Sequence, residues 1–198
     1  MSSKTASTRE RIIASARGLL ETNGYAGFGM EAIAEGAGVS RQAVYLHFGS
    51  KMGLLLALIE WLEQRAGLRD AIERIWSAPT ALQALDRAVE VHARIDPEFI
   101  PLASALDEAR RTDDDAAAVW RDRMGARYET GRRLIERLKH EGMLHPRWTV
   151  ASATDFWWAT MSPFTHRLLS DERGWSAKRY AESMKLAMRR ALTTADAP

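Results

Sequence analysis

The segment from Met30 to Lys51 constrains the fold more than any other stretch of this chain. It has the sequence MEAIAEGAGVSRQAVYLHFGSK. An apolar pattern typical of a short helix runs into Ala37-Gly38-Val39, and a second short helix opens at Ser40. Two short helices joined by a tight, glycine-containing turn are typical of a helix-turn-helix, whose second helix enters the major groove of DNA. The segment therefore predicts a DNA-binding protein.

Helix signals surround this segment, and strand signals are almost absent from the chain. Ser7 and Glu10 have the spacing of a capping box, and Asn23-Gly24 supplies a stop for the helix between them. Ser50 can cap a fourth helix over residues 51–67, whose broad apolar face suits a link to the rest of the chain. We therefore expect an all-α fold that begins with a three-helix helix-turn-helix domain.

Five or six further helices are expected after residue 67, for about nine in total. Pro79-Thr80 and Asp96-Pro97 stand where a helix can begin, although Pro101 would bend or shorten the second of these helices. Three consecutive aspartates, Asp113 to Asp115, suit the positive end of a helix dipole. The remaining expected helix starts are Thr149, Pro163 (restarting or kinking the preceding helix) and Ser176.

The composition argues against several classes of protein. The chain has no cysteine, no apolar run of the roughly 18 residues that span a bilayer, and no apolar N-terminal segment of the signal-peptide kind. Its five histidines lack the close spacing of a metal site, and no Gly-x-Ser-x-Gly nucleophile motif occurs. We therefore expect a cytoplasmic protein that is not an enzyme and needs no metal or cofactor.

The formal net charge of +2 is too small to indicate a polyanion partner by itself. Four cations nevertheless lie in the first seventeen residues: Lys4, Arg9, Arg11 and Arg17. They would meet DNA phosphates or form a solvated helix face, and the sequence leaves both interpretations open.

Residues 9–55 resemble the tetracycline-repressor (TetR) family of bacterial transcriptional regulators. The matching positions are Gly24, Tyr25, Ile33, Ala34, Ala37 to Ser40, Tyr45, His47, Phe48, Ser50 and Lys51. The resemblance implies a helix-turn-helix domain over residues 1–50. It also implies a helical ligand-binding and dimerisation domain over residues 51–198, which begins with the linking helix 51–67.

The predicted DNA-binding residues lie on and around the second helix of the motif. Arg41 and Gln42 are the best candidates for base edges, because arginine pairs with guanine and glutamine with adenine; Arg41 could equally contact a phosphate. Leu46 would touch a thymine methyl group or lie exposed. The other predicted contacts are Ser40 at the helix cap, and Tyr45, His47 and Lys51, which resemble the family's backbone clamps. Val44, Phe48, Ile33 and Ala34 are expected to be core.

Two positions depart from the family pattern. A hydroxyl residue is common just before the second helix, where this chain has Phe28-Gly29. Either backbone N–H groups at Gly29 and Met30 supply the phosphate contact there, or the contact is lost. Gly36 replaces a better helix former, at a cost of about 0.5–1 kcal/mol relative to alanine.

The resemblance further implies a homodimer that binds a palindromic operator in double-stranded DNA. The last two helices, about residues 150–169 and 177–192, would form a four-helix interface. Their expected contact face comprises Ala177, Tyr180, Met184, Ala187 and Ala191. The alternative is that this face packs within its own subunit.

The resemblance also implies a pocket for a small hydrophobic or aromatic effector that would release a repressor from its operator. The candidate lining residues are Trp61, His92, Phe99, Leu102, Trp120, Met124, Tyr128, Trp157 and Met161. Ordinary core packing is the alternative for many of them, and His92 could be a structural histidine. A second function class also stays open, namely a helical adaptor or dimerisation protein that keeps the helix-turn-helix as a scaffold.

Overall fold

A computed structural model of the chain describes residues 6–194, except for the side chains of Ile95, Asp96 and Glu98. Lys4 thus lies outside the described residues. Within them the chain is all-α, as predicted, and the sole extended pairing is an isolated antiparallel bridge between Leu144 and Thr193.

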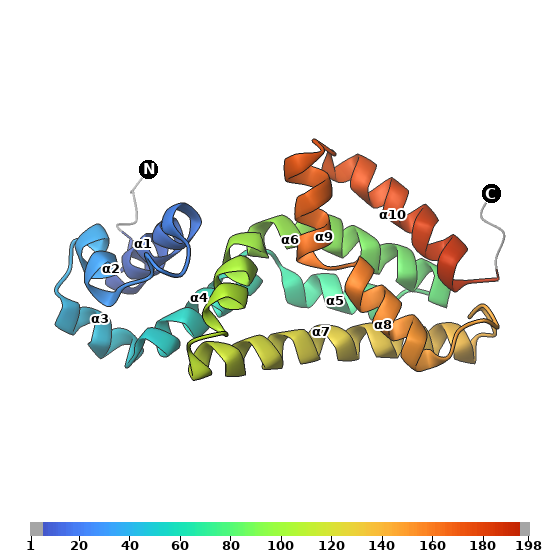
Figure 1. Cartoon of the computed structure of the whole chain (residues 1–198), viewed down its shortest axis with the longest axis horizontal. Helices are drawn as coiled ribbons and strands as arrows, with labels where there is room; N and C mark the ends of the chain where they lie inside the picture. Colours follow the sequence, from blue (N-terminus) through green and yellow to red (C-terminus); the bar gives the residue numbers. More distant parts are fainter. Residues whose placement is uncertain (1–5, 195–198) are drawn as a thin grey trace. The chain divides into compact units, whose positions relative to one another are not determined.

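Ten α-helices and one π-helical turn make up this part of the chain, against about nine helices expected (Figure 1). In chain order they are α1 (Thr8–Asn23), α2 (Met30–Ala37), α3 (Arg41–Phe48), α4 (Lys51–Arg65), α5 (Leu68–Trp76), α6 (Ala81–Ala109), α7 (Asp114–His140), α8 (Val150–Thr160), α9 (Pro163–Arg167), η1 (Leu168–Glu172) and α10 (Ala177–Leu192).

The chain divides into two compact units. Unit 1 comprises Met1–Ala66 and Pro101–Trp120, and unit 2 comprises Gly67–Ile100 and Arg121–Pro198. Unit 1 thus contains the expected linking helix and also the turn between α6 and α7. The division by function at residue 50 stays a prediction, because the compactness of a unit does not test it.

The first helix of unit 1 follows directly from its sequence signals. The Ser7 hydroxyl accepts from the Glu10 N–H at 3.2 Å, and the Glu10 carboxylate accepts from the Ser7 N–H at 2.7 Å, which confirms the capping box. The helix ends at Asn23, because Gly24 takes a φ of +60°. Its buried face consists of Ile12, Ile13, Ala16 and Leu20.

The junction between α3 and α4 depends on a glycine. Ser50 caps α4 as predicted, accepting from the N–H of Gly53 at 3.0 Å. A Cβ atom on Gly53 would lie 2.0 Å from the carbonyl oxygen of Phe48. Only glycine therefore lets the end of α3 and the first turn of α4 approach this closely.

The prediction that a helix begins at Asp96-Pro97 is wrong, because α6 continues from Ala81 to Ala109. Pro97 and Pro101 each lack the N–H that a helix interior uses, and each normally disfavours such a helix. Buried residues lie on both sides of the prolines: Ala93 in unit 2 and Leu102 in unit 1. Packing of these apolar residues offsets the hydrogen bonds lost at the two prolines.

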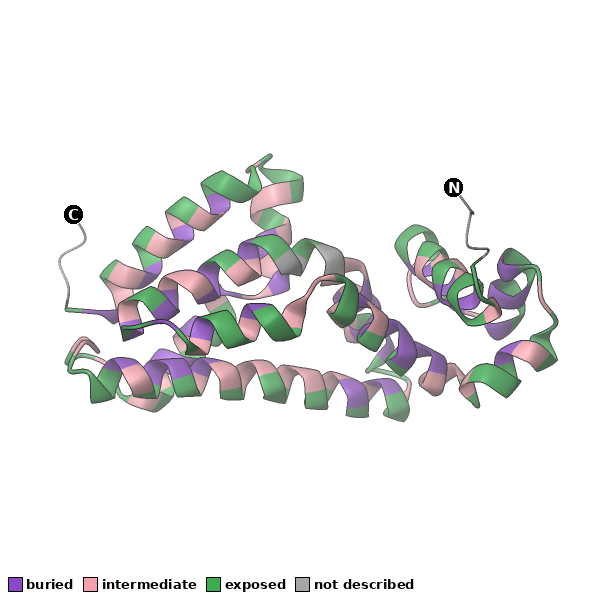
Figure 2. Cartoon of the chain, turned by 180° about the vertical axis from the view of Figure 1, so that it is seen from behind, coloured by how far each residue is buried: buried purple, intermediate pink, exposed green. Residues whose placement is uncertain are grey.

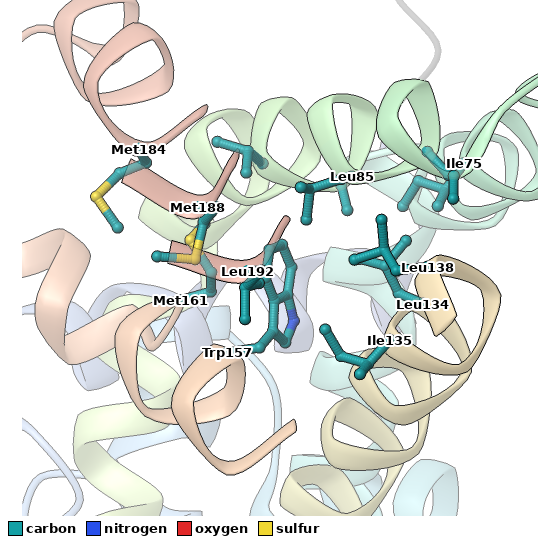
Figure 3. Close-up of a cluster of buried hydrophobic side chains, with 14 of the residues drawn as sticks. Ile75, Leu85, Leu134, Ile135, Leu138, Trp157, Met161, Met184, Met188 and Leu192 are labelled. Atoms are coloured by element: carbon teal, nitrogen blue, oxygen red, sulfur yellow. The ribbon is translucent and has the colours of Figure 1, made fainter. Parts of the chain in front are cut away.

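Unit 2 has its own hydrophobic core, drawn in Figure 3. Leu134, Ile135 and Leu138 project from α7, Leu85 comes from α6, and the indole of Trp157 from α8 lies among them, beside Met188 and Leu192 of α10. Met184 and Tyr180, about one and two turns before Met188 on α10, belong to the same cluster. The residues of α10 at four-residue spacing, from Tyr180 to Leu192, thus pack in the core of unit 2.

Other helix boundaries were partly predictable. Thr149, Ser162 and Ser176 cap α8, α9 and α10, and Pro163 occupies the first position of α9, so the expected restart is confirmed. The helix α5 was not predicted; it follows Gly67, whose backbone takes the left-handed conformation. No single helix of residues 6–194 is long and apolar enough to cross a membrane, although α3 and α4, bent by 66° at their junction, pass that test as a pair.

Candidate nucleic-acid interface

The frame of the candidate interface is the turn between α2 and α3. Gly38 takes a left-handed conformation, and the N–H of Val39 donates to the Ala34 carbonyl at 3.0 Å, closing the end of α2. The Ser40 hydroxyl then accepts from the N–H of Ala43 at 3.1 Å and starts α3. Three residues, Gly38 to Ser40, thus turn the chain from one helix into the next, as in a helix-turn-helix.

The second helix of this motif is anchored through one side and open on the other (Figure 2). Val44 is its one buried residue, and Phe48 is half-buried. Ile33 and Ala34 of α2 are buried as well. Val44, Ile33 and Ala34 are thus core residues as expected, whereas Phe48 is only partly buried. The predicted DNA contacts on α3 and its cap, from Ser40 to His47, are all exposed: Ser40, Arg41, Gln42, Tyr45, Leu46 and His47.

Arg41 and Tyr45 form a pair one helical turn apart on this open side. An Nη2 of Arg41 lies 3.4 Å from the Tyr45 hydroxyl, to which it donates, and the guanidinium lies 5.6 Å from the centre of the Tyr45 ring. The contact limits the directions that the arginine samples. Leu46, beside them, is 85% exposed, which is unusual for a large apolar side chain and leaves it free to contact a base.

At the start of α2 only backbone groups are available for binding. Gly29 is the N-cap of α2 and makes no side-chain capping bond, while the side chain of Met30 is buried. Any contact with an anion here must therefore use the N–H groups of the first turn, where the helix dipole favours negative charge.

Lys51, a predicted phosphate contact, points toward the protein. Its Nζ lies 3.8 Å from the centre of the Tyr25 ring and 5.9 Å from that of Phe28. The Tyr25 hydroxyl in turn donates to an Asp113 carboxylate oxygen at 2.7 Å. Desolvation lowers the pKa of Lys51, and the charge of Asp113 opposes this shift. A role for Asp113 here was not predicted, because 88 residues separate it from Tyr25.

The cations of α1 have partners within unit 1. Arg11 donates to the carbonyl of Ala37 at 3.1 Å, at the end of α2. Arg17 pairs with Glu21 at 2.6 Å, and the guanidinium of Arg9 lies 5.4 Å from the centre of the Phe48 ring. Arg11 and Arg17 therefore stabilise the helix-turn-helix domain itself.

The candidate effector residues in unit 2 are partly core. Trp157 and Met161 are buried in the hydrophobic cluster, and the ring of His92 meets Trp157 edge-on at 5.9 Å. Tyr128 donates to Asp155 at 3.1 Å, and the Trp158 indole N–H donates to the Met124 carbonyl at 3.4 Å. Phe99 is half-buried.

Three further candidates belong to unit 1. Leu102 is buried, whereas Trp61 and Trp120 are half-buried and carry guanidinium groups over their rings. Arg17 and Arg65 lie 5.7 and 5.3 Å from the centre of Trp61, and Arg110 lies 5.1 Å from that of Trp120. These guanidinium groups partly cover the two indole rings within unit 1.

The face expected to form a dimer requires a correction. Tyr180 and Met184 are buried in the core of unit 2 and are not available to a second subunit. A row of residues at four-residue spacing, from Tyr180 to Leu192, faces the core of unit 2. This is the alternative that the sequence had left open, in which the face packs within its own subunit. Ala177 and Ala187 are exposed, and Ala191 is half-buried.

The helix-turn-helix region is similar to known bacterial regulators. Residues 12–58 match the family model described as "Bacterial regulatory proteins, tetR family". The chain is 34% identical over 137 residues to the HTH-type transcriptional regulator CymR of Pseudomonas putida, covering 66% of this chain and 59% of the relative. It is 33% identical over 111 residues to the regulator EthR of Mycolicibacterium smegmatis, covering 55% and 50%. The matches thus span between half and three fifths of these two curated relatives.

Solved structures extend the likeness to the fold of most of the chain. A putative transcriptional regulator from Saccharomonospora viridis, in complex with choline, gives a TM-score of 0.77 at 18% identity, covering 94% of this chain and 98% of that one. The regulator FadR from Bacillus subtilis, in complex with stearoyl-CoA, gives 0.72 at 18% identity, covering 90% and 96%. At this identity the likeness concerns the fold alone.

Proposed function

We propose that this chain is a member of the TetR family of bacterial regulatory proteins, and that it is a sequence-specific DNA-binding transcriptional regulator and not an enzyme. The observation that carries the proposal is the open side of α3. Arg41, Gln42 and Leu46 are exposed there together, on a short helix capped by Ser40 and anchored by Val44. A bacterial regulator of this kind acts on DNA in the cytoplasm.

The proposed mode of binding places α3 in the major groove. Arg41 would pair with guanine and Gln42 with adenine, each good pair discriminating between bases by about 1–3 kcal/mol. Tyr45, His47 and the N–H groups that follow Gly29 would contact phosphates and fix the register on the duplex. Sequence information would thus come from the first turn of α3, and the surrounding groups would add affinity.

We propose a homodimer through α8 and α10, because one short helix cannot specify an operator alone. With Tyr180 committed to the core, the surface left for a partner comprises Trp158 on α8 and Leu186 and Ala187 on α10. Trp158 and Leu186 are 37% and 40% exposed, respectively. Two copies related by a two-fold axis would read the two halves of a palindrome.

The proposed effector is a small hydrophobic or aromatic molecule whose binding weakens DNA binding. The fold neighbours solved with choline and with stearoyl-CoA support a ligand-responsive helical lobe. The effector would bind better to a conformer in which the two copies of α3 are wrongly spaced for adjacent major grooves. The loss of DNA affinity would equal the effector's preference for that conformer.

The alternative function, a helical adaptor that keeps the helix-turn-helix as a scaffold, has two observations in its favour. Gly29 provides no side-chain cap or hydroxyl for a phosphate, and Lys51 lies over the Tyr25 ring. An adaptor would need neither contact. The exposed Arg41 and Gln42 favour DNA binding over this alternative.

The test is a binding titration against the duplex DNA that flanks the chain's own gene, at several salt concentrations. DNA binding predicts that the logarithm of the affinity falls linearly with the logarithm of the salt concentration, by about 0.9 for each phosphate neutralised. Arg41→Ala should weaken specific binding more than the control Arg121→Ala, which removes an exposed arginine of α7. Equal affinities of the two variants would favour the adaptor.

A further inference from the structure

We propose that Tyr25 and Asp113 are positioning residues for Lys51 and that they limit how strongly this lysine can bind a DNA phosphate. The inference rests on the proposed function, since it concerns a phosphate contact of the helix-turn-helix. It assigns to the turn between α6 and α7, where Asp113 lies, an influence on DNA affinity.

The ammonium group of Lys51 lies over an aromatic ring. Lys51 opens α4, and its Nζ lies 3.8 Å from the centre of the Tyr25 ring. The Tyr25 and Phe28 rings are stacked, with their centres 6.3 Å apart, and Phe28 is fully buried. The ammonium therefore lies on an aromatic surface at the edge of a core. Moving it to a phosphate breaks this contact.

Asp113 fixes the position of the Tyr25 ring. The Tyr25 hydroxyl donates to one carboxylate oxygen at 2.7 Å, and the other oxygen accepts from the Ala116 N–H at 3.0 Å, at the start of α7. The carboxylate thus has a defined position between the Tyr25 hydroxyl and the first turn of α7. Its negative charge attracts Lys51, and the hydrogen bond makes the phenol ring more electron-rich.

Competition between the ring and a phosphate follows from these contacts. A lysine has one compact charge, which cannot lie over a ring and contact a phosphate with full strength at the same time. A cation–π contact of this kind alters an equilibrium constant by about two- to thirty-fold. Removing the contact should therefore raise DNA affinity within that range and allow Lys51 to neutralise one more phosphate.

The DNA experiment uses variants that remove one feature each. Tyr25→Leu removes the ring, and Asp113→Asn removes the charge while keeping a residue that caps α7. Tyr25→Leu should raise affinity for the operator about two- to thirty-fold and steepen the salt slope by about 0.9, with a smaller gain for Asp113→Asn. Both gains should vanish in a Lys51→Met background. A gain that persists there, or no gain at all, would overturn the proposal.

A second measurement needs no DNA and keeps the inference separable from the proposed function. Reductive methylation with ¹³C-formaldehyde labels the five lysines without removing their charge, and Lys51→Arg identifies the Lys51 signal. The Tyr25 ring should shift that signal upfield, and Tyr25→Leu should return it to the position of the exposed lysines. Lys139→Met is the matched control, an exposed lysine of α7 whose loss should leave the Lys51 signal unchanged.

The two measurements together separate the possible failures. An unshifted Lys51 signal in the wild-type chain would overturn the positioning role even if the chain binds DNA. A shifted signal in a chain that binds no duplex at any salt concentration would overturn the proposed function, and with it the competition with phosphate. A shifted signal that moves downfield when the operator is added is the expected result.

Discussion

A Cβ atom on Gly36 would lie 2.5 Å from the hydroxyl oxygen of Ser15. That hydroxyl donates to the carbonyl of Ile33 at 3.0 Å, so a serine of α1 reaches the backbone of α2. By helix propensity alone, Gly36 weakens α2. The structure supplies its reason, because the two helices approach too closely there for a side chain.

Gly36→Ala should therefore destabilise the chain, although alanine is the better helix former. The new methyl group displaces the Ser15 hydroxyl from its partly buried hydrogen bond, and we expect a net loss of about 1–2 kcal/mol in the free energy of unfolding. In a Ser15→Ala background the hydroxyl is gone, and the atom nearest to the added Cβ is the Cβ of residue 15, at 3.5 Å. There the same substitution should stabilise the chain by about 0.5–1 kcal/mol. Urea denaturation of the four chains measures this reversal of sign.

Gly18→Ala is the matched control for this cycle. Gly18 lies on α1 with nothing within 4 Å of an added Cβ, so alanine should stabilise the chain by about 0.5–1 kcal/mol. If Gly36→Ala stabilised the wild-type chain as Gly18→Ala does, the close approach of α1 and α2 would be refuted.

The N-terminal helices were predictable because their signals are local. The Ser7 capping box, the Gly24 stop and the Ser40 cap each act within a few residues. The Tyr25–Asp113 bond joins residues 88 positions apart, and no local pattern marks such a contact. The continuity of α6 depended on packing around two prolines, which local propensity opposes.

At the candidate site, too, features set by local sequence were predictable, and features set by distant segments were not. The exposed residues of α3 were predictable from the motif, since the spacing around Val44 decides which side of a short helix is buried. The direction of the Lys51 side chain was not, because it depends on an aromatic surface from another segment. The apolar row of α10 could pack against a second subunit or within its own subunit, and the sequence did not distinguish the two. In the structure it packs in the core of unit 2.

Gly29→Ser should strengthen both the fold and DNA binding. Gly29 has extended backbone angles and open space around an added Cβ, so serine fits without strain and can cap α2. We expect a gain of a few tenths of a kcal/mol in stability. We also expect a several-fold gain in operator affinity, because the hydroxyl can contact a phosphate. Gly29→Ala, measured by fluorescence anisotropy alongside it, should lack the gain in affinity.

Stability at high pH should depend on Tyr25. Burial, and then the hydrogen bond to Asp113, raise the pKa of Tyr25 above its ordinary value of 10.0. Its contribution is therefore complete below pH 10.0 and is lost as the pH rises through the higher folded-state pKa. In Tyr25→Phe the free energy of unfolding should therefore fall less as the pH rises, by on the order of 1 kcal/mol. The difference is small because solvent screens a partly exposed pair. Tyr45→Phe, an exposed tyrosine, is the control in urea titrations between pH 8 and pH 11.

Stability at low pH should depend on Asp113. The N–H of Ala116, followed by the Tyr25 hydroxyl, lowers the pKa of Asp113 below its ordinary value of 3.8. The contribution of Asp113 is therefore complete above that value and is lost as the pH falls through the lower folded-state pKa. Asp113→Asn should be less stable than the wild type at pH 6 and approach it as the pH falls toward 2. Parallel curves for the two chains would contradict this assignment.

The proposed dimer should dissociate when a charge is placed on its apolar surface. Leu186→Glu adds a carboxylate to the exposed side of α10, and Trp158→Glu does the same on α8. Sedimentation velocity should show a monomer for either variant, with melting temperatures close to that of a Lys178→Glu control on the first turn of α10. A dimer that survives both charges would place the interface elsewhere.

In vitro selection from a random duplex library tests whether the open side of α3 reads DNA sequence. The wild-type chain should enrich one palindrome with half-sites about one helical turn, roughly 10 base pairs, apart. Arg41→Ala should lose its preference at one symmetry-related pair of positions, by about 1–3 kcal/mol, and keep the preference elsewhere. A library that stays random after repeated rounds, with a folded and dimeric chain, would contradict the assignment of this protein as a sequence-specific regulator.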